Sequence, residues 1–238
     1  MSLTVIYRLS DNGYAKEKFA YATKFHCLYN FCKHFPRNII HLMVDDTNIK
    51  DETLALMSGM HRSEEFASFN IYTGGSSAAS WRNGVTKLDG LNLSESDYVY
   101  FVEDDYIHRQ NSMKVLLEGL ARADYVSLYD HADKYIPAAK GGNPYIDEDG
   151  TEETRVALTE SCHWKLTNST TMTLATSVQV LKEDRKIWDV GTDGTYPHDF
   201  NMFIQLRQMG RSLITPIPGY STHTEPKWAS PLIDWSKV

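Results

Sequence analysis

Three consecutive acidic residues, Glu103, Asp104 and Asp105, follow directly on the apolar run at residues 98–102. Like charges packed this closely repel one another, and a carboxylate withdrawn from water needs a compensating positive charge. The closely flanking residues, 98–107, contain no Lys or Arg that could supply it. Hard cations such as Mg²⁺ and Mn²⁺ take oxygen ligands, commonly one or two carboxylates together with the phosphates of a substrate. The trio therefore fits a divalent-metal site for a diphosphate, while a solvated turn and half of a two-metal nuclease site remain alternatives.

Alternating strands and helices in the first hundred residues must position these acids. Buried or β-prone apolar runs predict strands, and apolar residues at helical spacing predict helices between them. The predicted strands are 3–7, 39–44, 66–72 and 98–102, and the predicted helices are 15–35, 53–60 and 81–88. This alternation is typical of an α/β fold with a central, mostly parallel sheet flanked by helices. Because the 238 residues contain no visible linker, we expect a single domain.

Polar side chains stand at the ends of three of these strands. Arg8 follows the first strand, Asp45 and Asp46 follow the second, and the acidic trio follows the fourth. Ligands of parallel α/β sheets bind at the carboxyl ends of the strands. We therefore expect these groups to converge on one ligand site.

The second half of the chain alternates less regularly. We expect helices at 113–121, 177–185 and 198–210, the last one ended by Gly210. Strands are expected in "ADYVSLYD", "WKLTNSTTMTLAT" and "SLITPIPGY", whereas residues 137–155 are rich in Gly, Pro and acids and predict a loop or hairpin. The tail from Ser221 carries Trp228 and Trp235 and is expected to wrap over the domain.

Composition and charge restrict the partners. The formal charge of −7 offers no general attraction for nucleic acid or anionic lipid, so we expect neither as a partner. No apolar run approaches the roughly 20 residues of a membrane span, and "MSLTVIYRLS" lacks the regions of a signal peptide. The three cysteines lack metal-type spacing and predict free thiols in a reducing compartment. A cytoplasmic location is therefore expected.

The stretch "GGSSAASWRNGVTKLDGLNLSESDYVYFVEDD" resembles family 2 glycosyltransferases of the GT-A fold. These carry a small-residue run, an Ala-Arg-Asn-type turn, and then an apolar strand that ends in a DxD-type motif. Here Arg82 and Asn83 stand in the Arg-Asn place, and the acidic trio stands in the DxD place. The resemblance implies one GT-A domain over residues 1–238, with a nucleotide-sugar-binding half at 1–110. Residues 111–238 would form the acceptor-binding half, with the C-terminal tail.

The resemblance also implies where the base of a nucleotide-diphospho-sugar donor would lie. Arg8 ends the strand that meets the base and ribose. Asp45 or Asp46 would accept a hydrogen bond from the base, and Arg82 would bind a phosphate or the base.

For the diphosphate end of the donor, the resemblance implies a divalent ion, Mn²⁺ or Mg²⁺. Glu103 and Asp104 would bind the nucleotide sugar, Asp104 through the ribose hydroxyls. Asp105 would ligate the metal. His223 follows the last predicted strand and stands where many metal-dependent GT-A enzymes take a late histidine as a further ligand.

The catalytic base is expected at the start of the helix at 198–210. Family 2 enzymes place an acidic pair there, and its second member takes the proton from the acceptor hydroxyl. In this sequence His198 and Asp199 stand in place of the usual Glu-Asp, so Asp199 is the candidate base. A base opposite the leaving group implies a single displacement and inversion at the sugar carbon. The acceptor class cannot be named from the sequence.

Each candidate also has a purely structural interpretation. An Arg is commonly a surface ion-pair partner, an Asp after a strand commonly begins a turn, and Asp199 would be favoured at a helix start in any case. The leading alternative function is a non-catalytic nucleotide-sugar or glycan-binding module of the same fold. Phosphatases of the haloacid dehalogenase type are disfavoured because "VDDTN" lacks their motif spacing. Sugar nucleotidyltransferases are disfavoured because "IYRLSDNGYAKEK" has a single Gly.

Overall fold

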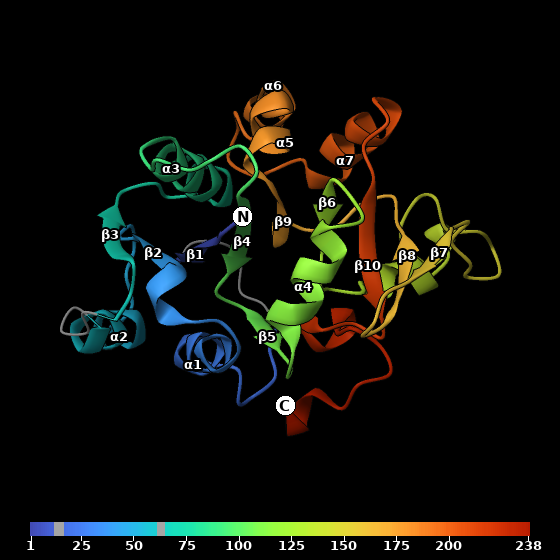
Figure 1. The fold of residues 1–238 in the computed structure, drawn as a ribbon. Helices are drawn as coiled ribbons and strands as arrows, with labels where there is room; N and C mark the ends of the chain where they lie inside the picture. The colour runs from blue at the N-terminus through green and yellow to red at the C-terminus, as the bar shows by residue number, and fades with distance from the viewer. Residues whose placement is uncertain (12–16, 61–64) are drawn as a thin grey trace.

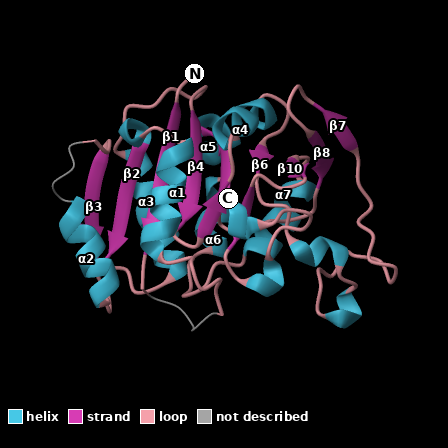
Figure 2. Cartoon of the chain, turned by 90° about the horizontal axis from the view of Figure 1, so that it is seen from below, coloured by secondary structure: helices cyan, strands magenta, loops and turns pink. Residues whose placement is uncertain are grey.

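A computed structural model of the chain describes residues 1–11, 17–60 and 65–238. The described residues form a central sheet with the strand order β3-β2-β1-β4-β9-β6-β10-β8-β7, and Figure 2 shows this row from β3 on the left to β7 on the right. The strands are β1 (Leu3–Leu9), β2 (Ile40–Asp45), β3 (Ser68–Tyr72), β4 (Tyr98–Glu103), β6 (Tyr125–Val126), β7 (Val156–Leu158), β8 (His163–Leu166), β9 (Leu174–Ser177) and β10 (Leu213–Ile217).

Most of these strands point the same way. The pairs β3-β2, β2-β1, β1-β4 and β6-β10 are parallel, and only β9 and β8 run against their neighbours. A separate antiparallel pair joins β5 (Tyr106–His108) to β11 (Ser221–His223). The expected mostly parallel central sheet is confirmed.

Helices cover both faces of the sheet, so the fold has three layers (Figure 1). One face is packed by α1, α2 and α4, and the other by α3, α5, α6 and α7. Their bounds are α1 (Lys24–His34), α2 (Asp51–Met60), α3 (Ser77–Asp89), α4 (Ser112–Leu120), α5 (Val178–Glu183), α6 (Arg185–Gly191) and α7 (Asp199–Gln208). Short 3₁₀ helices are η1 (Arg37–Ile39), η2 (Ala132–Tyr135), η3 (Ala138–Lys140), η4 (Pro226–Trp228) and η5 (Trp235–Lys237).

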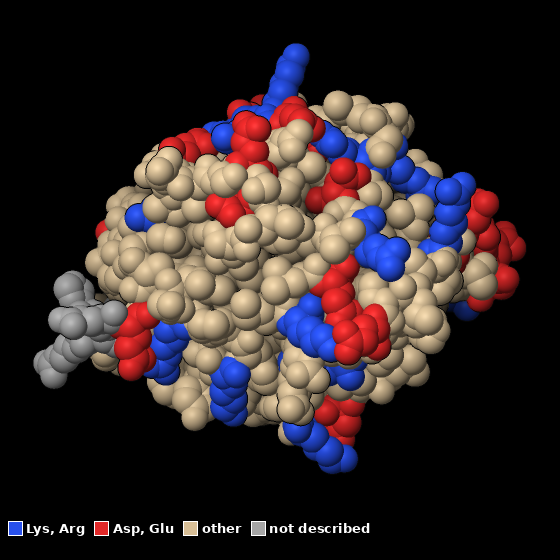
Figure 3. All heavy atoms as spheres, viewed as in Figure 1, with Lys and Arg blue, Asp and Glu red and all other residues tan. Residues whose placement is uncertain are grey.

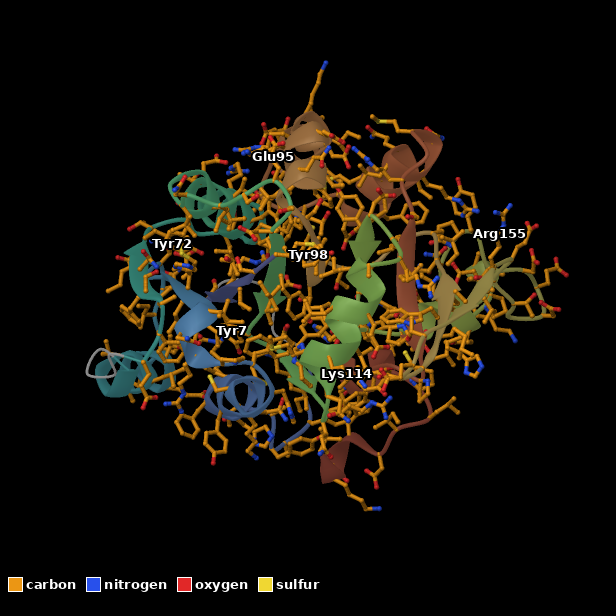
Figure 4. All side chains as sticks on the ribbon, in the orientation of Figure 1. Tyr7, Tyr72, Glu95, Tyr98, Lys114 and Arg155 are labelled. Atoms are coloured by element: carbon orange, nitrogen blue, oxygen red, sulfur yellow. The ribbon has the colours of Figure 1, made fainter. Side chains whose placement is uncertain are left out.

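The central position of β1 follows from its sequence. All seven of its residues are buried, as expected for a strand covered on both faces of a parallel sheet. Tyr7 lies between the sheet and α1 (Figure 4), with its ring 5.4 Å from that of Phe31. On the opposite face α3 approaches closely at Gly84, where a Cβ would come within 2.9 Å of Ile6. The strand is therefore held from both sides.

Both packed faces join the two halves of the chain. The cluster under α1 and α4 contains Tyr100 from the first half and Trp164 from the second. The cluster under α3 and α7 contains Trp81 from the first half and Phe203 from the second. We therefore continue to predict one cooperative domain.

Several element predictions needed correction. The helix predicted at 15–35 begins at Lys24, where Thr23 caps it; residues 15 and 16 of that prediction lie outside the described residues. The strand predicted in "ADYVSLYD" is only two residues long, since the chain leaves the sheet after Val126. The prediction missed α6 and the β5–β11 pair, which are too short to show a period.

Candidate functional site

Arg8 and the acidic trio meet at the carboxyl edge of the sheet. The register of β1 and β4 places Arg8 beside Glu103, with 3.5 Å between Nη2 and Oε1. Ser77 and Ser80, from the first turn of α3, join them in a cavity of about 70 Å³ that Arg8, Ser10, Glu103, Asp104 and Asp105 also line. The N-terminus of a helix favours anionic groups such as phosphates. The edge therefore combines the acids with two features that bind phosphate.

Arg8 is 3% exposed, yet its charge is well compensated. It donates a hydrogen bond from Nη2 to the carbonyl of Met172 at 2.9 Å, and its guanidinium lies 5.6 Å from the Trp81 ring centre. Glu103 also accepts from the hydroxyl of Thr173 at 3.1 Å. The Arg8–Glu103 pair is thus rigidly positioned.

The chain itself supplies further positive charge to the trio. Lys24 donates to Asp104, which also accepts the backbone N–H of Ser10 at 2.8 Å. Burial alone would lower the pKa of Lys24, but the charge and hydrogen bond of Asp104 raise it overall. Nζ of Lys18 lies 3.7 Å from Asp105. The trio lacks close basic neighbours in sequence, but Lys18 and Lys24 lie beside it in the fold.

Asp105 and His223 lie side by side although 118 positions separate them in the sequence. Pairing of β5 with β11 sets His223 opposite Tyr106, and the N–H of Thr224 bonds the carbonyl of Asp105 at 2.9 Å. Nε2 of His223 lies 3.2 Å from Oδ2 of Asp105. Its Nδ1 accepts the N–H of Glu225 at 3.2 Å, which orients the ring. The two predicted metal ligands are therefore adjacent.

This pair fits a divalent ion that shares its shell with a substrate. Among the residues that the structure describes, no three His, Cys, Asp or Glu side chains gather as a metal cluster. A carboxylate and an imidazole supply two donors, and ions of the Mg²⁺ type commonly complete their shell with phosphate and water oxygens. Because Nδ1 accepts a hydrogen bond, a neutral His223 carries its proton on Nε2; an ion bound at Nε2 would require that proton to lie on Nδ1 instead, where the Glu225 carboxylate is 3.7 Å away. We therefore expect an ion whose ligands come partly from the protein and partly from the substrate and water, and not a site made of protein ligands alone.

Asp45 holds a loop. It is fully buried and accepts backbone N–H groups from Thr47 at 3.0 Å, Gly74 at 3.1 Å and Gly75 at 2.8 Å. Gly75 has φ +75°, so the small-residue run "TGGSS" turns here through a conformation that glycine allows. Asp45 thus places the start of α3. Asp46 is exposed and accepts from the hydroxyl of Thr73 at 2.6 Å.

Arg82 lies in the second turn of α3, beyond Ser77 and Ser80. Its Nη1 donates to the carbonyl of Gly194 at 3.4 Å. Neither Arg82 nor the two aspartates after β2 are among the described residues that line the cavity of the trio. Arg8 supplies the guanidinium there.

Asp199 is the first residue of α7, and its Oδ1 accepts the N–H of Phe200 at 2.8 Å. The pKa of Asp199 is raised to about 6: burial is the largest cause, the negative charges of Glu103 and Asp133 add to it, and the Phe200 hydrogen bond and Lys134 act against it. A carboxyl group with a pKa near the working pH suits general-base catalysis. Asp199 lines a cavity together with Thr171, whose hydroxyl lies 2.7 Å from that of Tyr106, the residue after Asp105, and this contact links the cavity to the edge with the trio.

The cavity that Asp199 lines is a second one, of about 290 Å³. Its walls come from η2, the loop at 141–144, residues 169–171, the start of α7, and Trp228 of η4. The sequence predictions missed the wall residues His131, Asp133, Lys134 and Asn143, whose types are common in loops. The acidic, Gly-rich stretch at 137–155 was the available signal, since loops of compact domains often carry function.

A larger cavity of about 590 Å³ lies elsewhere, between α1 and α2. Its lining is mainly apolar and includes Phe25, Tyr29, Leu56 and Phe66. The charged residues of its described lining are Glu52 and Arg37, and Arg37 is paired with Glu65. The candidate site is therefore the carboxyl edge of the sheet, because of the acids and phosphate-binding groups gathered there, although the cavity between α1 and α2 is larger.

The charge pattern and the cysteines agree with the sequence analysis. Acidic and basic side chains are interspersed on the face shown in Figure 3. None of the helices in the described ranges is both long and apolar enough to cross a membrane. Cys27, Cys32 and Cys162 are free thiols, and burial raises the pKa of Cys27 to about 12, so that thiol is inert.

Comparison with known proteins adds information about the fold. No protein-family profile and no curated protein sequence matches the chain, whereas 138 chains of solved structures are similar to it. One is the crystal structure of GalNAc-T7 with UDP, GalNAc and Mn²⁺, at a TM-score of 0.61 and 14% sequence identity. The match covers 96% of this chain and 45% of that one, so this chain spans less than half of that protein's length. The chain has the GT-A fold, as predicted; the similarity does not single out family 2.

Proposed function

We propose that this chain is a divalent-metal-dependent glycosyltransferase that moves a sugar from a nucleotide-diphospho-sugar to an acceptor hydroxyl, with inversion at the sugar carbon. The observation that carries the proposal is the position of Asp199. It lines the second cavity and is influenced by Glu103, which lines the cavity of the trio. A proton acceptor between a diphosphate site and a second substrate site is the arrangement that sugar transfer needs.

On the donor side, Arg8 and the first turn of α3 would bind the phosphates. Glu103 positions Arg8, and Asp104 lies in the same cavity, where its carboxylate would bind the ribose hydroxyls. Asp46 is the exposed member of the pair after β2 and is the better candidate for the base. Asp45 would act indirectly, by fixing the loop at Gly74 and Gly75 that leads into α3. Arg82 would need the loop around Gly194 to shift before it could reach a phosphate.

Asp105 and His223 would hold the divalent ion. When bound, such an ion stabilises the negative charge that develops on a leaving nucleoside diphosphate. The GalNAc-T7 structure contains Mn²⁺ with UDP, so Mn²⁺ and a uridine nucleotide are the first ligands to test. Mg²⁺ remains the alternative ion.

On the acceptor side, Asp199 would take the proton from the attacking hydroxyl. Its raised pKa, about 6, leaves it ionised at neutral pH while keeping it basic enough to receive that proton. Attack from the side opposite the leaving diphosphate gives the inverted anomer. The proposal therefore includes a stereochemical outcome that can be read by NMR.

The free thiols support a reducing compartment, and we propose the cytoplasm as the location.

A thermal-shift screen of nucleotide-diphospho-sugars, with and without Mn²⁺, tests the proposal. A donor at 100 times its dissociation constant should stabilise the protein by about 2.7 kcal/mol. Calorimetry with UDP and a donor-hydrolysis assay then separate the transferase from a binding module of the same fold. Metal-dependent binding without any turnover would favour the module. Equal binding in excess EDTA would contradict the metal site.

A further inference from the structure

The lysine in the wall of the cavity bordered by Asp199 is already engaged by protein groups. Lys134 is 2% exposed, and its Nζ donates to Asn168 at 2.8 Å and Ser169 at 2.7 Å, with Asp133 at 3.7 Å. Asn143 donates to Ser169 at 3.1 Å. The lysine is therefore committed to the protein and is not a free anion-binding group.

One carboxylate oxygen in this cavity has unused hydrogen-bonding capacity. Oδ1 of Asp133 is buried and receives no hydrogen bond within the described part of the chain. It lies 2.9 Å from Nδ1 of His131, but that nitrogen already accepts the N–H of Asp133 at 3.0 Å. A neutral imidazole that accepts at Nδ1 has no proton to give there. Since a buried acceptor without a donor is costly, Asp133 Oδ1 is suited to accept from a ligand hydroxyl.

Aromatic side chains line the same space. Trp228 is half-buried, and its ring centre lies 5.6 Å from that of His131. Phe200 lines the cavity next to Asp199. A sugar ring has C–H bonds on its faces and hydroxyls around its rim, so it matches a site with aromatic surfaces and carboxylate acceptors.

Charge decides between acceptor classes. Asp133 and Asp199 both line the cavity, and Glu103 influences Asp199. A phosphate or carboxylate on the acceptor would face these acids, and among the described lining residues the lysine is Lys134, which is already engaged. Lys227 lies outside that lining, with its Nζ 4.4 Å from the ring centre of Trp228. At about 290 Å³, the cavity is at the small end of ligand pockets, which run from about 300 to 1,000 Å³, so it suits one or two sugar units.

We infer that this cavity binds an uncharged sugar unit of the acceptor, with Trp228 against the ring face and Asp133 accepting from a ring hydroxyl. The inference rests on the proposed function, because it makes the reacting hydroxyl the one that faces Asp199. Asp133 and Trp228 then become determinants of acceptor specificity.

Saturation-transfer NMR on the full chain tests this inference, with UDP and diamagnetic MgCl₂ present in place of Mn²⁺, which would broaden the ligand signals. The probes are methyl glycosides of glucose, galactose and N-acetylglucosamine, against glucose 6-phosphate and glycerol 3-phosphate. At least one neutral glycoside should bind, and the phosphates should not. Trp228→Ala should weaken binding by roughly tenfold or more, and Trp228→Phe should retain part of it. Asp133→Asn should weaken it less, since the amide oxygen still accepts.

Matched controls are Tyr29→Ala, an exposed aromatic on α1, and Asp189→Asn, an exposed acid on α6. Neither should change glycoside binding. Unchanged binding in Trp228→Ala, or preferential binding of the phosphates, would overturn the inference, as would failure of all glycosides while UDP still binds. If UDP fails to bind but a glycoside is held through Trp228, the proposed function fails and the carbohydrate site stands.

Discussion

The two halves of the chain differ in strand length and in what they bury. In residues 1–110 the four parallel strands β3, β2, β1 and β4 are five to seven residues long, and every residue of β1 is buried. In residues 111–238 the strands have two to five residues, and a buried lysine, Lys134, and a buried amide, Asn143, line a cavity. The first half is a rigid scaffold whose strand ends carry charge. The second half builds a polar pocket, whose hydrogen-bonded network replaces part of the apolar packing but leaves Oδ1 of Asp133 without a donor in the described part of the chain.

Contacts at the site cross this division, and His223 makes one of them. His223 belongs to the second half, yet it lies beside Asp105 of the first. The proposed metal site therefore requires both halves to be folded, whereas the cavity of the trio has lining residues from the first half alone. This difference predicts which substitutions alter nucleotide binding and which alter only transfer.

The largest effect is expected for Asp105→Asn. Loss of the charged ligand should remove metal-dependent nucleotide binding, and the loss of several kcal/mol of stabilisation should slow transfer by roughly 10²–10⁴-fold. Calorimetry with UDP and MnCl₂ and a transfer assay measure both. His223→Ala should act in the same direction. If Asp105→Asn keeps full Mn²⁺ dependence, the metal does not bind at this edge.

Asp199→Asn should slow transfer by about 10²–10⁴-fold and leave nucleotide affinity unchanged, because the base acts on the acceptor side. The parent's kcat/KM should rise with pH through a midpoint of about 6, and the variant should lose this limb. His198→Ala is the control and should be milder. Near-parent transfer by Asp199→Asn would exclude it as the base, and Asp130 and Asp193 would be tested next.

The stability of Asp199→Asn distinguishes a general base at Asp199 from a purely structural residue. The folded-state pKa of Asp199 lies above its usual 3.8, so the folded protein binds that proton more tightly than the unfolded chain does. Any stability from this proton is present at low pH and is lost as pH rises from about 4 to 6. Asp199→Asn should therefore not destabilise the protein at pH 7, as thermal melts can show.

Lys24→Met should have a smaller effect, mainly on stability. It leaves Asp104 without its lysine in a site where the Lys24 side chain is 16% exposed. Breaking such a pair should cost about 1–3 kcal/mol, below the full cost for a completely buried pair. MnCl₂ should stabilise this variant more than the parent, because a divalent ion replaces part of the lost charge.

The matched control for this prediction is Lys114→Met. Lys114 is labelled on α4 in Figure 4 and forms exposed ion pairs with Glu160 and Glu118. Ion pairs of so exposed a lysine contribute little to stability, so this variant should melt almost as the parent does. Equal destabilisation of the two variants would refute the special role of Lys24.

The smallest effects are expected for Gly84→Ala and Gly119→Ala, one in each half. The new Cβ would lie 2.9 Å from Ile6 in the first case and 2.6 Å from Trp164 in the second. Overpacking costs about 1–3 kcal/mol and is partly offset by the higher helix propensity of Ala, about 1 kcal/mol. Gly119→Ala should be the worse of the two.

Unfolding of these variants also tests the single domain. Denaturant titrations followed by fluorescence and circular dichroism should show one coincident transition for each variant. Gly90→Ala is the control, because its Cβ would meet only ordinary contacts. Two separate transitions, each shifted by one variant, would mean that the halves fold independently.

The sequence by itself determined the elements whose signal is local. The apolar runs of β1, β2 and β4 predict buried strands, and the ends of parallel strands must share an edge, so the sequence pattern alone brings Arg8 and the acidic trio together. Asp105 and His223 could be paired only through the family resemblance. Their contact depends on β5 and β11, three-residue strands with no period of their own.

Only the tertiary structure decided what surrounds those groups. Lys18 and Lys24 lie beside the trio although 80 positions separate Lys24 from Asp104, and no local pattern encodes that contact. Asp45 holds a loop because the backbone amides of Gly74 and Gly75 converge on it. The cavity with Asp133 and Trp228 joins segments almost a hundred residues apart. Side-chain types show what chemistry is possible, but burial and the partners brought by distant segments decide which groups remain available for a ligand.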